Sequence, residues 1–104
     1  MAEKIQLCKV SDVDVGDMLR VDIDGVPPIA VYNIDGEIYA TSNICTHATA
    51  FLTNGYLEDD LVECPVHGGT FNVRTGEAVD FPCEIDLKTY AVSVEDGNVM
   101  AVVE

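Results

Sequence analysis

The sequence is poor in basic residues and has no long apolar run. Only 5 lysines and arginines stand against 19 aspartates and glutamates, which gives a formal net charge of −14. Such a chain repels nucleic acid and anionic lipid, and it attracts basic protein surfaces. No stretch reaches the roughly 18 apolar residues of a membrane-spanning helix, and the N-terminus shows no signal-peptide pattern. We therefore expect a cytoplasmic protein that binds neither nucleic acid nor membrane.

The sequence also lacks repeats, low-complexity linkers and any long helical pattern. Its 104 residues suit one compact domain, and its 48% of apolar residues is enough for a folded core. The segment from Leu19 to Ile23 alternates apolar and polar residues, as a half-buried strand does. Residues 29–41 predict a hairpin across Asp35-Gly36, and residues 90–103 predict another across Asp96-Gly97. These short strands and turns predict an all-β protein, a small sandwich or barrel.

Residues 42–82 differ from the rest, because their strands are short and they hold all the cysteine-histidine chemistry. Cys45-Thr46-His47 is followed, after 16 residues, by Cys64-Pro65-Val66-His67. His47 and His67 are the only two histidines of the chain, and each follows a cysteine closely, so coincidence is a poor explanation. Thiolate and imidazole ligands suit soft to borderline metals. The pattern therefore predicts a metal centre on two loops.

Two kinds of metal centre fit this ligand set. Zinc is often bound by two cysteines and two histidines, but zinc fingers usually pair like with like and carry the histidines on a helix. A Rieske [2Fe–2S] cluster binds one iron through two cysteines and the other through two histidines. One cysteine and one histidine on each loop let each loop reach both irons. The pattern favours the Rieske cluster, and a zinc-stabilised interaction module remains the alternative.

Cys45-Thr46-His47 and Cys64-Pro65-Val66-His67-Gly68-Gly69 are similar to the two cluster-binding boxes of Rieske proteins. The similarity extends through residues 37–40, 71–76 and 87–90, so it covers nearly the whole chain. Within this family, the sequence resembles the small ferredoxins of bacterial aromatic-ring-hydroxylating dioxygenases of the biphenyl and naphthalene type. The resemblance implies a single Rieske domain over residues 1–104. Its base would be an antiparallel β-sandwich of residues 1–41 and 83–104, with an inserted cluster-binding subdomain of about residues 42–82.

The resemblance also implies a ligand set and a role. One [2Fe–2S] cluster would be bound by Cys45, His47, Cys64 and His67, with the two histidines on the outer iron near the tip. The protein would be a soluble, monomeric carrier of single electrons from a flavin-dependent NAD(P)H reductase to a terminal Rieske oxygenase. It would not be an enzyme itself, because a chain without a third histidine cannot build a mononuclear iron site of two histidines and a carboxylate. The small Rieske-like subunit of an assimilatory nitrite reductase is an alternative.

Departures from the family pattern concern the reduction potential. High-potential members resemble each other in two further loop cysteines and in a serine and a tyrosine that donate hydrogen bonds to sulfur. The corresponding residues here are Ala50, Val66, Gly69 and Phe71. Fewer donors stabilise the reduced cluster less, so we expect a potential near the bottom of the Rieske range of about −150 to +300 mV. Cys8 and Cys83 lie outside both boxes and are expected to be structural, although Cys83 is placed to come near the cluster.

Overall fold

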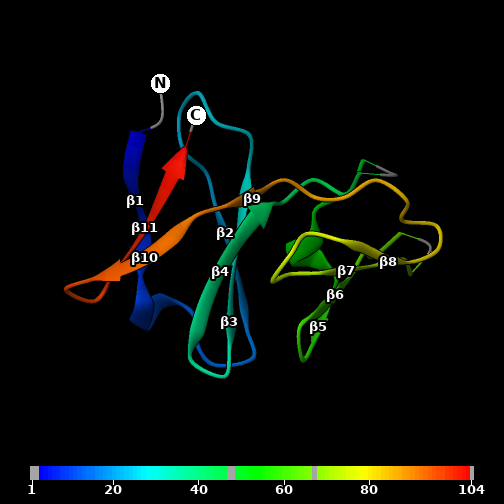
Figure 1. The fold of residues 1–104 in the computed structure, drawn as a ribbon, viewed down its shortest axis with the longest axis horizontal. Helices are drawn as coiled ribbons and strands as arrows, with labels where there is room; N and C mark the ends of the chain where they lie inside the picture. Colours follow the sequence, from blue (N-terminus) through cyan, green and yellow to red (C-terminus); the bar gives the residue numbers. More distant parts are fainter. Residues whose placement is uncertain (1–2, 47–48, 67, 104) are drawn as a thin grey trace.

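The computed structural model describes residues 3–46, 49–66 and 68–103 (Figure 1). Its strands are β1 (Glu3–Lys9), β2 (Met18–Val21), β3 (Ile29–Ile34), β4 (Glu37–Ser42), β5 (Tyr56–Glu58), β6 (Leu61–Glu63), β7 (Thr70–Asn72), β8 (Ala78–Asp80), β9 (Thr89–Tyr90), β10 (Val92–Glu95) and β11 (Asn98–Val103). Two short 3₁₀ helices, η1 (Val10–Asp12) and η2 (Leu52–Asn54), lie between them. None of the described residues forms a helix long and apolar enough to cross a membrane. The expectation of an all-β fold is confirmed.

The strands form three antiparallel sheets, which Figure 1 shows side by side. The outer sheet has the order β1-β11-β10, the central sheet β2-β3-β4-β9, and the distal sheet β5-β6-β7-β8. The outer and central sheets pack against each other and form the base of the molecule. The distal sheet packs on the other face of the central sheet. The molecule is thus a β-sandwich base that carries a second, smaller layer of strands.

Strand β3 explains how one central sheet serves two cores. All six of its residues are buried, which is why the sequence reads as a continuous apolar run rather than an alternating one. Ile29 and Val31 pack with the outer sheet, whereas Ala30, Tyr32 and Ile34 pack with the distal layer. Because successive side chains of a strand point to opposite faces, β3 joins the two cores through the pleat of its backbone.

Both predicted hairpins are present, and their turn residues have the backbone that such turns need. Asp35 and Gly36 have φ angles of 52° and 92°, and Asp96 and Gly97 have φ angles of 53° and 78°. Two consecutive residues with positive φ are typical of the tight turn whose twist matches that of the flanking strands. The register places Ile34 opposite Glu37 and Glu95 opposite Asn98, as two-residue loops require.

The structure differs from the sequence-based expectation at two strands. Strand β2 ends at Val21, so Ile23 lies in the following turn rather than in the strand. The alternating segment from Tyr90 to Glu95 is two strands in different sheets, because β9 pairs with β4 and β10 pairs with β11. The chain changes sheet at Ala91. Alternation reveals that a strand is half-buried but does not reveal its partner, so this corner of the sandwich was not predictable from the pattern.

Candidate metal centre

The first cysteine loop follows β4 and is held by Asn43, a fully buried polar residue. The Asn43 amide nitrogen donates to Thr53 Oγ1 at 2.9 Å, and its side-chain oxygen accepts from the Thr53 N–H at 2.9 Å. Its backbone oxygen accepts from the Leu52 N–H at 2.9 Å. The Cys45 N–H then donates to the Ala50 carbonyl at 3.0 Å, which closes the loop. Cys45 is 3% exposed, so the loop presents its thiol to the interior.

The second cysteine loop connects β6 to β7. The Cys64 N–H donates to the Gly69 carbonyl at 2.8 Å, next to the last paired residues Glu63 and Thr70. Cys64 is fully buried. Gly55 lets another part of the chain approach this loop, because a Cβ at Gly55 would lie 1.9 Å from the Glu63 carbonyl oxygen. Only a residue without a Cβ fits such a contact.

A third loop, from β8 to β9, covers the two cysteine loops. The Cys83 N–H donates to the Asp80 carbonyl at 3.1 Å. The Thr46 hydroxyl donates to the Ile85 carbonyl at 2.6 Å, which connects the first cysteine loop to this one. Cys83 is 5% exposed and belongs to the same distal core as Cys45 and Cys64. The fold therefore gathers three of the four cysteines, whereas Cys8 packs at the edge of the base core.

The three gathered thiols interact, and the surroundings of Cys64 and Cys83 disfavour the anionic form of these two. Burial, followed by the neighbouring Cys45, raises the pKa of Cys83 to about 12. Burial raises the pKa of Cys64 to about 11, although a hydrogen bond from the Val66 backbone opposes this rise. None of the four cysteines forms a disulfide. A metal ion supplies the positive charge that deprotonates a coordinating thiol outright, so this pocket has the chemistry of a thiolate-metal site.

Two of the four predicted ligands are described. The structure brings Cys45 and Cys64 together, and a hydrogen bond connects their side chains. His47 and His67 lie outside the described residues. Within the described ranges, no group of three or more His, Cys, Asp or Glu side chains is arranged to hold a metal ion. The four-ligand set therefore stays a prediction that combines two observed thiols with two histidines.

Comparison with known proteins identifies the family. Residues 3–91 match the Rieske [2Fe–2S] domain. This chain belongs to the Rieske family. Its cofactor is thus a Rieske-type [2Fe–2S] cluster, and the described pocket fits this cofactor, because two buried thiols from separate loops are what one of its irons requires.

Relatives of this Rieske protein are ferredoxins of aromatic dioxygenase systems. The ferredoxin component of the naphthalene 1,2-dioxygenase system of Pseudomonas putida is 45% identical over 92% of this chain and 91% of the relative. Among solved structures, the Sphingomonas yanoikuyae B1 ferredoxin has a TM-score of 0.95 and 46% identity over 98% of this chain and 100% of its own. A ferredoxin-like chain in the complex of reduced oxygenase and oxidized ferredoxin in carbazole 1,9a-dioxygenase has a TM-score of 0.90 and 41% identity, covering 94% and 91% of the two chains.

Sequence reasoning missed two residues that shape this Rieske site and found a third only in part. Asn43 carries no motif signal, since a single asparagine after a strand looks like an ordinary turn residue. Gly55 follows an asparagine, which in a sequence is an ordinary turn signal, whereas the structure shows that it makes room for the Glu63 carbonyl. Cys83 was expected to be structural but placed to come near the cluster, and its contact with Cys45 appears only when the three loops are assembled.

Proposed function

We propose that this chain carries single electrons from a flavin-dependent NAD(P)H reductase to the terminal oxygenase of an aromatic-ring-hydroxylating dioxygenase. Its cluster would be bound by Cys45, His47, Cys64 and His67, in a subdomain of about residues 42–82 that is inserted into the base. The observation that carries the proposal is the pair of buried thiols, Cys45 and Cys64, that two separate loops bring together. The relatives, which are ferredoxin components of dioxygenase systems, support the pathway over the nitrite reductase alternative.

The residues around the two thiols suit an electron carrier. When bound, the cluster supplies a one-electron couple. The protein holds the two sulfurs in a pocket whose loops are closed by backbone hydrogen bonds, Cys45 to Ala50 at 3.0 Å and Cys64 to Gly69 at 2.8 Å. The Val66 N–H adds a hydrogen bond to the Cys64 sulfur. Donors to ligand sulfur stabilise the more negative, reduced state, so the backbone itself helps the site to accept an electron.

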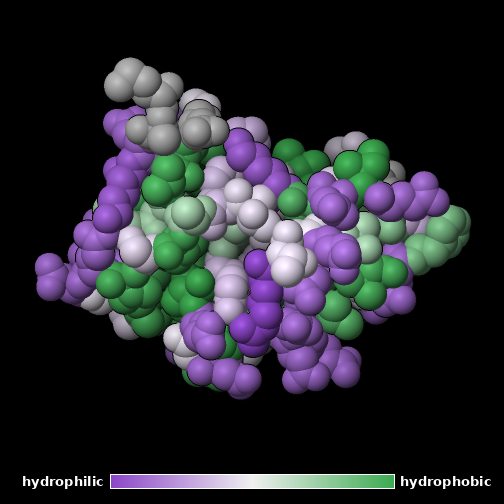
Figure 2. Space-filling view, in the orientation of Figure 1, coloured by the Kyte–Doolittle hydropathy of each residue, from purple (hydrophilic) through white to green (hydrophobic). Residues whose placement is uncertain are grey.

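Exposed apolar residues that suit a docking surface lie at the same end of the molecule. Figure 2 shows hydrophobic residues at the end that carries the distal sheet. Ile44, Phe81 and Ile85, on the loops around the cysteines, and Val79, in β8, are large exposed hydrophobic residues. We name these four residues the apolar tip. Asp80 and Glu84 lie between these residues in the sequence, and Asp86 follows Ile85. Transient redox partners need only a small interface, under about 1,200 Å², and the acids favour a partner with a basic rim.

The first experiment tests the cofactor. The purified protein is analysed for iron, zinc and acid-labile sulfide, and the dithionite-reduced protein is examined by EPR. We expect two irons and two sulfides per chain and an average g below that of all-cysteine clusters, because imidazole donates less charge than thiolate. His47→Cys and His67→Cys should each raise the average g or abolish the signal. Stoichiometric zinc without sulfide would overturn the proposal.

The second experiment tests the pathway and the docking surface. Reductase and oxygenase of a naphthalene dioxygenase system are combined with this protein, and electron delivery to the oxygenase is followed at several salt concentrations. We expect delivery that slows at high salt, since screening removes the electrostatic attraction. Phe81→Glu should slow electron delivery. Val94 is an exposed residue of the base, so Val94→Glu is the control and should not slow delivery. Equal effects of the two variants would contradict docking at the apolar tip.

A further inference from the structure

Cys83 occupies a place that neither cluster-binding box accounts for. It comes from the third loop, it is 5% exposed, and its side chain shares a hydrogen bond with Cys45. Its backbone is held by the bond to Asp80, and the neighbouring Ile85 carbonyl holds Thr46, the residue after Cys45. The Cys83 sulfur therefore reaches Cys45 from a loop that the rest of the fold keeps in place.

Gly69 shows how tightly the Cys83 sulfur is lodged. A Cβ at Gly69 would lie 2.4 Å from Cys83 Sγ, 3.0 Å from the Cys83 backbone nitrogen and 3.1 Å from the Asp80 carbonyl oxygen. The Gly69 carbonyl accepts the Cys64 N–H. The sulfur of Cys83 thus fills the space that a side chain at position 69 would take, between the two loops that supply Cys45 and Cys64.

This placement changes the expectation about donors near the cluster. The sequence predicts no side-chain donor at positions 69 and 71, which hold Gly69 and Phe71. The structure puts a thiol into the space beside Gly69 instead. A thiol is a weak donor, and a donor to a ligand sulfur stabilises the reduced cluster. The third loop therefore supplies what the second loop lacks.

We propose that the Cys83 thiol donates a hydrogen bond to the sulfur of Cys45 and thereby raises the reduction potential of the bound cluster. The proposal rests on the proposed binding of the cluster by Cys45 and Cys64. Cys83 is not a ligand in this arrangement, since the ligand set is complete without it. It is a tuning residue that acts through Cys45.

The test is the midpoint potential of Cys83→Ala, measured by a redox titration followed by EPR. We expect the equilibrium constant of reduction to fall about three- to tenfold, which is about 28 to 59 mV at 59 mV per tenfold change for one electron. Cys83→Ser keeps a donor and should stay at or above the wild-type potential. Cys8→Ala removes a thiol from the base core and is the matched control, with an unchanged potential.

A second variant pair restores the donor from the other loop. Gly69→Ser alone should displace the Cys83 side chain, because the new Cβ and the sulfur cannot share the space. Gly69→Ser combined with Cys83→Ala removes that conflict, and its hydroxyl should return the potential above that of Cys83→Ala. An unchanged potential in Cys83→Ala with full iron content would overturn the proposal. If Cys83→Ala does not hold the cluster, Cys83→Ser decides: a potential at or above wild type supports the proposal, and cluster loss there too overturns it.

These outcomes are separate from failure of the proposed function. If the wild-type protein holds no [2Fe–2S] cluster, the proposed function fails before any Cys83 variant is compared. If the wild type holds the cluster and Cys83→Ala has the wild-type potential, only the tuning role fails. A merely structural role of Cys83 would lower the thermal midpoint of unfolding in Cys83→Ala and leave the potential in place.

Discussion

The base and the distal layer are built from the same kind of strand but are stabilised differently. In the base, strands β1, β3, β4 and β11 are six or seven residues long, and the core between its sheets is mostly aliphatic. In the distal layer every strand has three residues, and the core includes three cysteines. Short strands offer few ladder hydrogen bonds and little apolar surface. From this difference we expect that burial alone stabilises the base, whereas the distal layer depends on the metal that its sulfurs bind.

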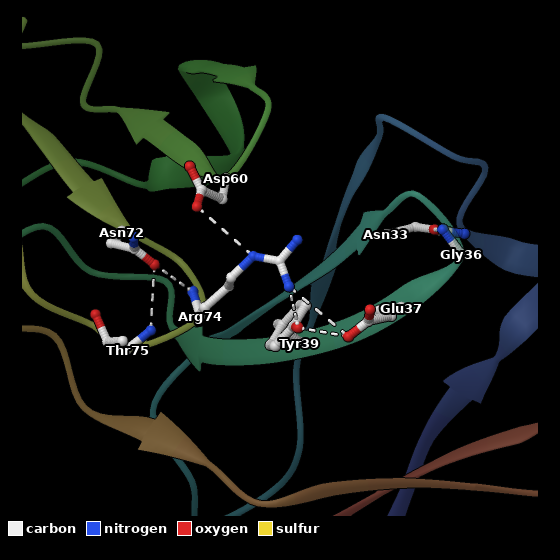
Figure 3. A network of polar contacts seen from close by, with 8 residues as sticks. All are labelled: Asn33, Gly36, Glu37, Tyr39, Asp60, Asn72, Arg74 and Thr75. Atoms are coloured by element: carbon white, nitrogen blue, oxygen red, sulfur yellow. Dashed lines mark hydrogen bonds and ion pairs between the residues drawn. The ribbon is translucent and has the colours of Figure 1, made fainter.

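The two regions meet at a polar network as well as at β3 (Figure 3). Arg74, which follows β7, donates to the Tyr39 hydroxyl of β4 at 2.6 Å and lies over the Tyr39 ring. Its guanidinium also lies 3.6 Å from the Asp60 carboxylate, in the turn between β5 and β6, and 3.7 Å from that of Glu37. Arg74 thus connects the distal layer to the base at the surface of the molecule.

The largest effect is expected from loss of the cluster, which should unfold the distal layer and leave the base folded. Cys64→Ala should abolish the cluster, because one of its irons loses a thiolate. We then expect fast amide hydrogen exchange in the distal layer and continued protection in β1 and β11, measured by hydrogen exchange with mass spectrometry. Cys8→Ala should leave both regions protected. Equal loss of protection in the base would show that the molecule is one cooperative unit.

Two alanine substitutions, one in each core, compare how the base core and the distal core contribute to stability and to cluster retention. Ile29→Ala in the base core and Leu52→Ala in the distal core each remove a fully buried side chain. Each should lower the free energy of unfolding by about 2–5 kcal/mol. Only Leu52→Ala should also speed loss of the visible absorbance of the cluster in denaturant. Identical absorbance loss in both variants would contradict the separation of the cores.

Alkaline pH tests the burial of Tyr32, a residue of strand β3, which separates the two cores. Burial raises the pKa of Tyr32, an effect that its hydrogen bond with Thr41 partly opposes. The folded state therefore keeps the phenol proton that the unfolded state releases near pH 10. Stability is fully present below about pH 10 and falls above it by about 1.4 kcal/mol per pH unit for this group. Urea midpoints at pH 8 and 11 should differ less in Tyr32→Phe, and an equal difference would contradict this role.

The smallest expected effect concerns the surface connection. Arg74→Ala should lower the free energy of unfolding by at most about 1 kcal/mol, because its partners are exposed to solvent. Its effect should be larger on hydrogen exchange in β7 than in β11. Lys4→Ala removes an exposed ion pair with Glu95 between two strands of the base. Its effect on hydrogen exchange should not be larger in the distal layer than in the base. A preference in both variants would count against Arg74 as the specific connection.

Several features of the fold follow from residues close together in the sequence. The hairpins at Asp35-Gly36 and Asp96-Gly97 were predictable, since a two-residue turn with positive φ depends on the turn residues themselves. The buried strand of residues 29–34 was predictable from its apolar run. The change of sheet at Ala91 was not, because it depends on which strands lie nearby after folding.

The sequence by itself predicted that two boxes, Cys45-Thr46-His47 and Cys64-Pro65-Val66-His67, bind one cluster, since each box is a short pattern with its own chemistry. Only the tertiary structure decided that Cys83 reaches Cys45 and that Gly55 admits the Glu63 carbonyl. The physical reason is the distance along the sequence over which the interactions act. Turns and ligand boxes depend on backbone and side chains within a few residues, whereas close packing depends on which surfaces the folded sheets press together.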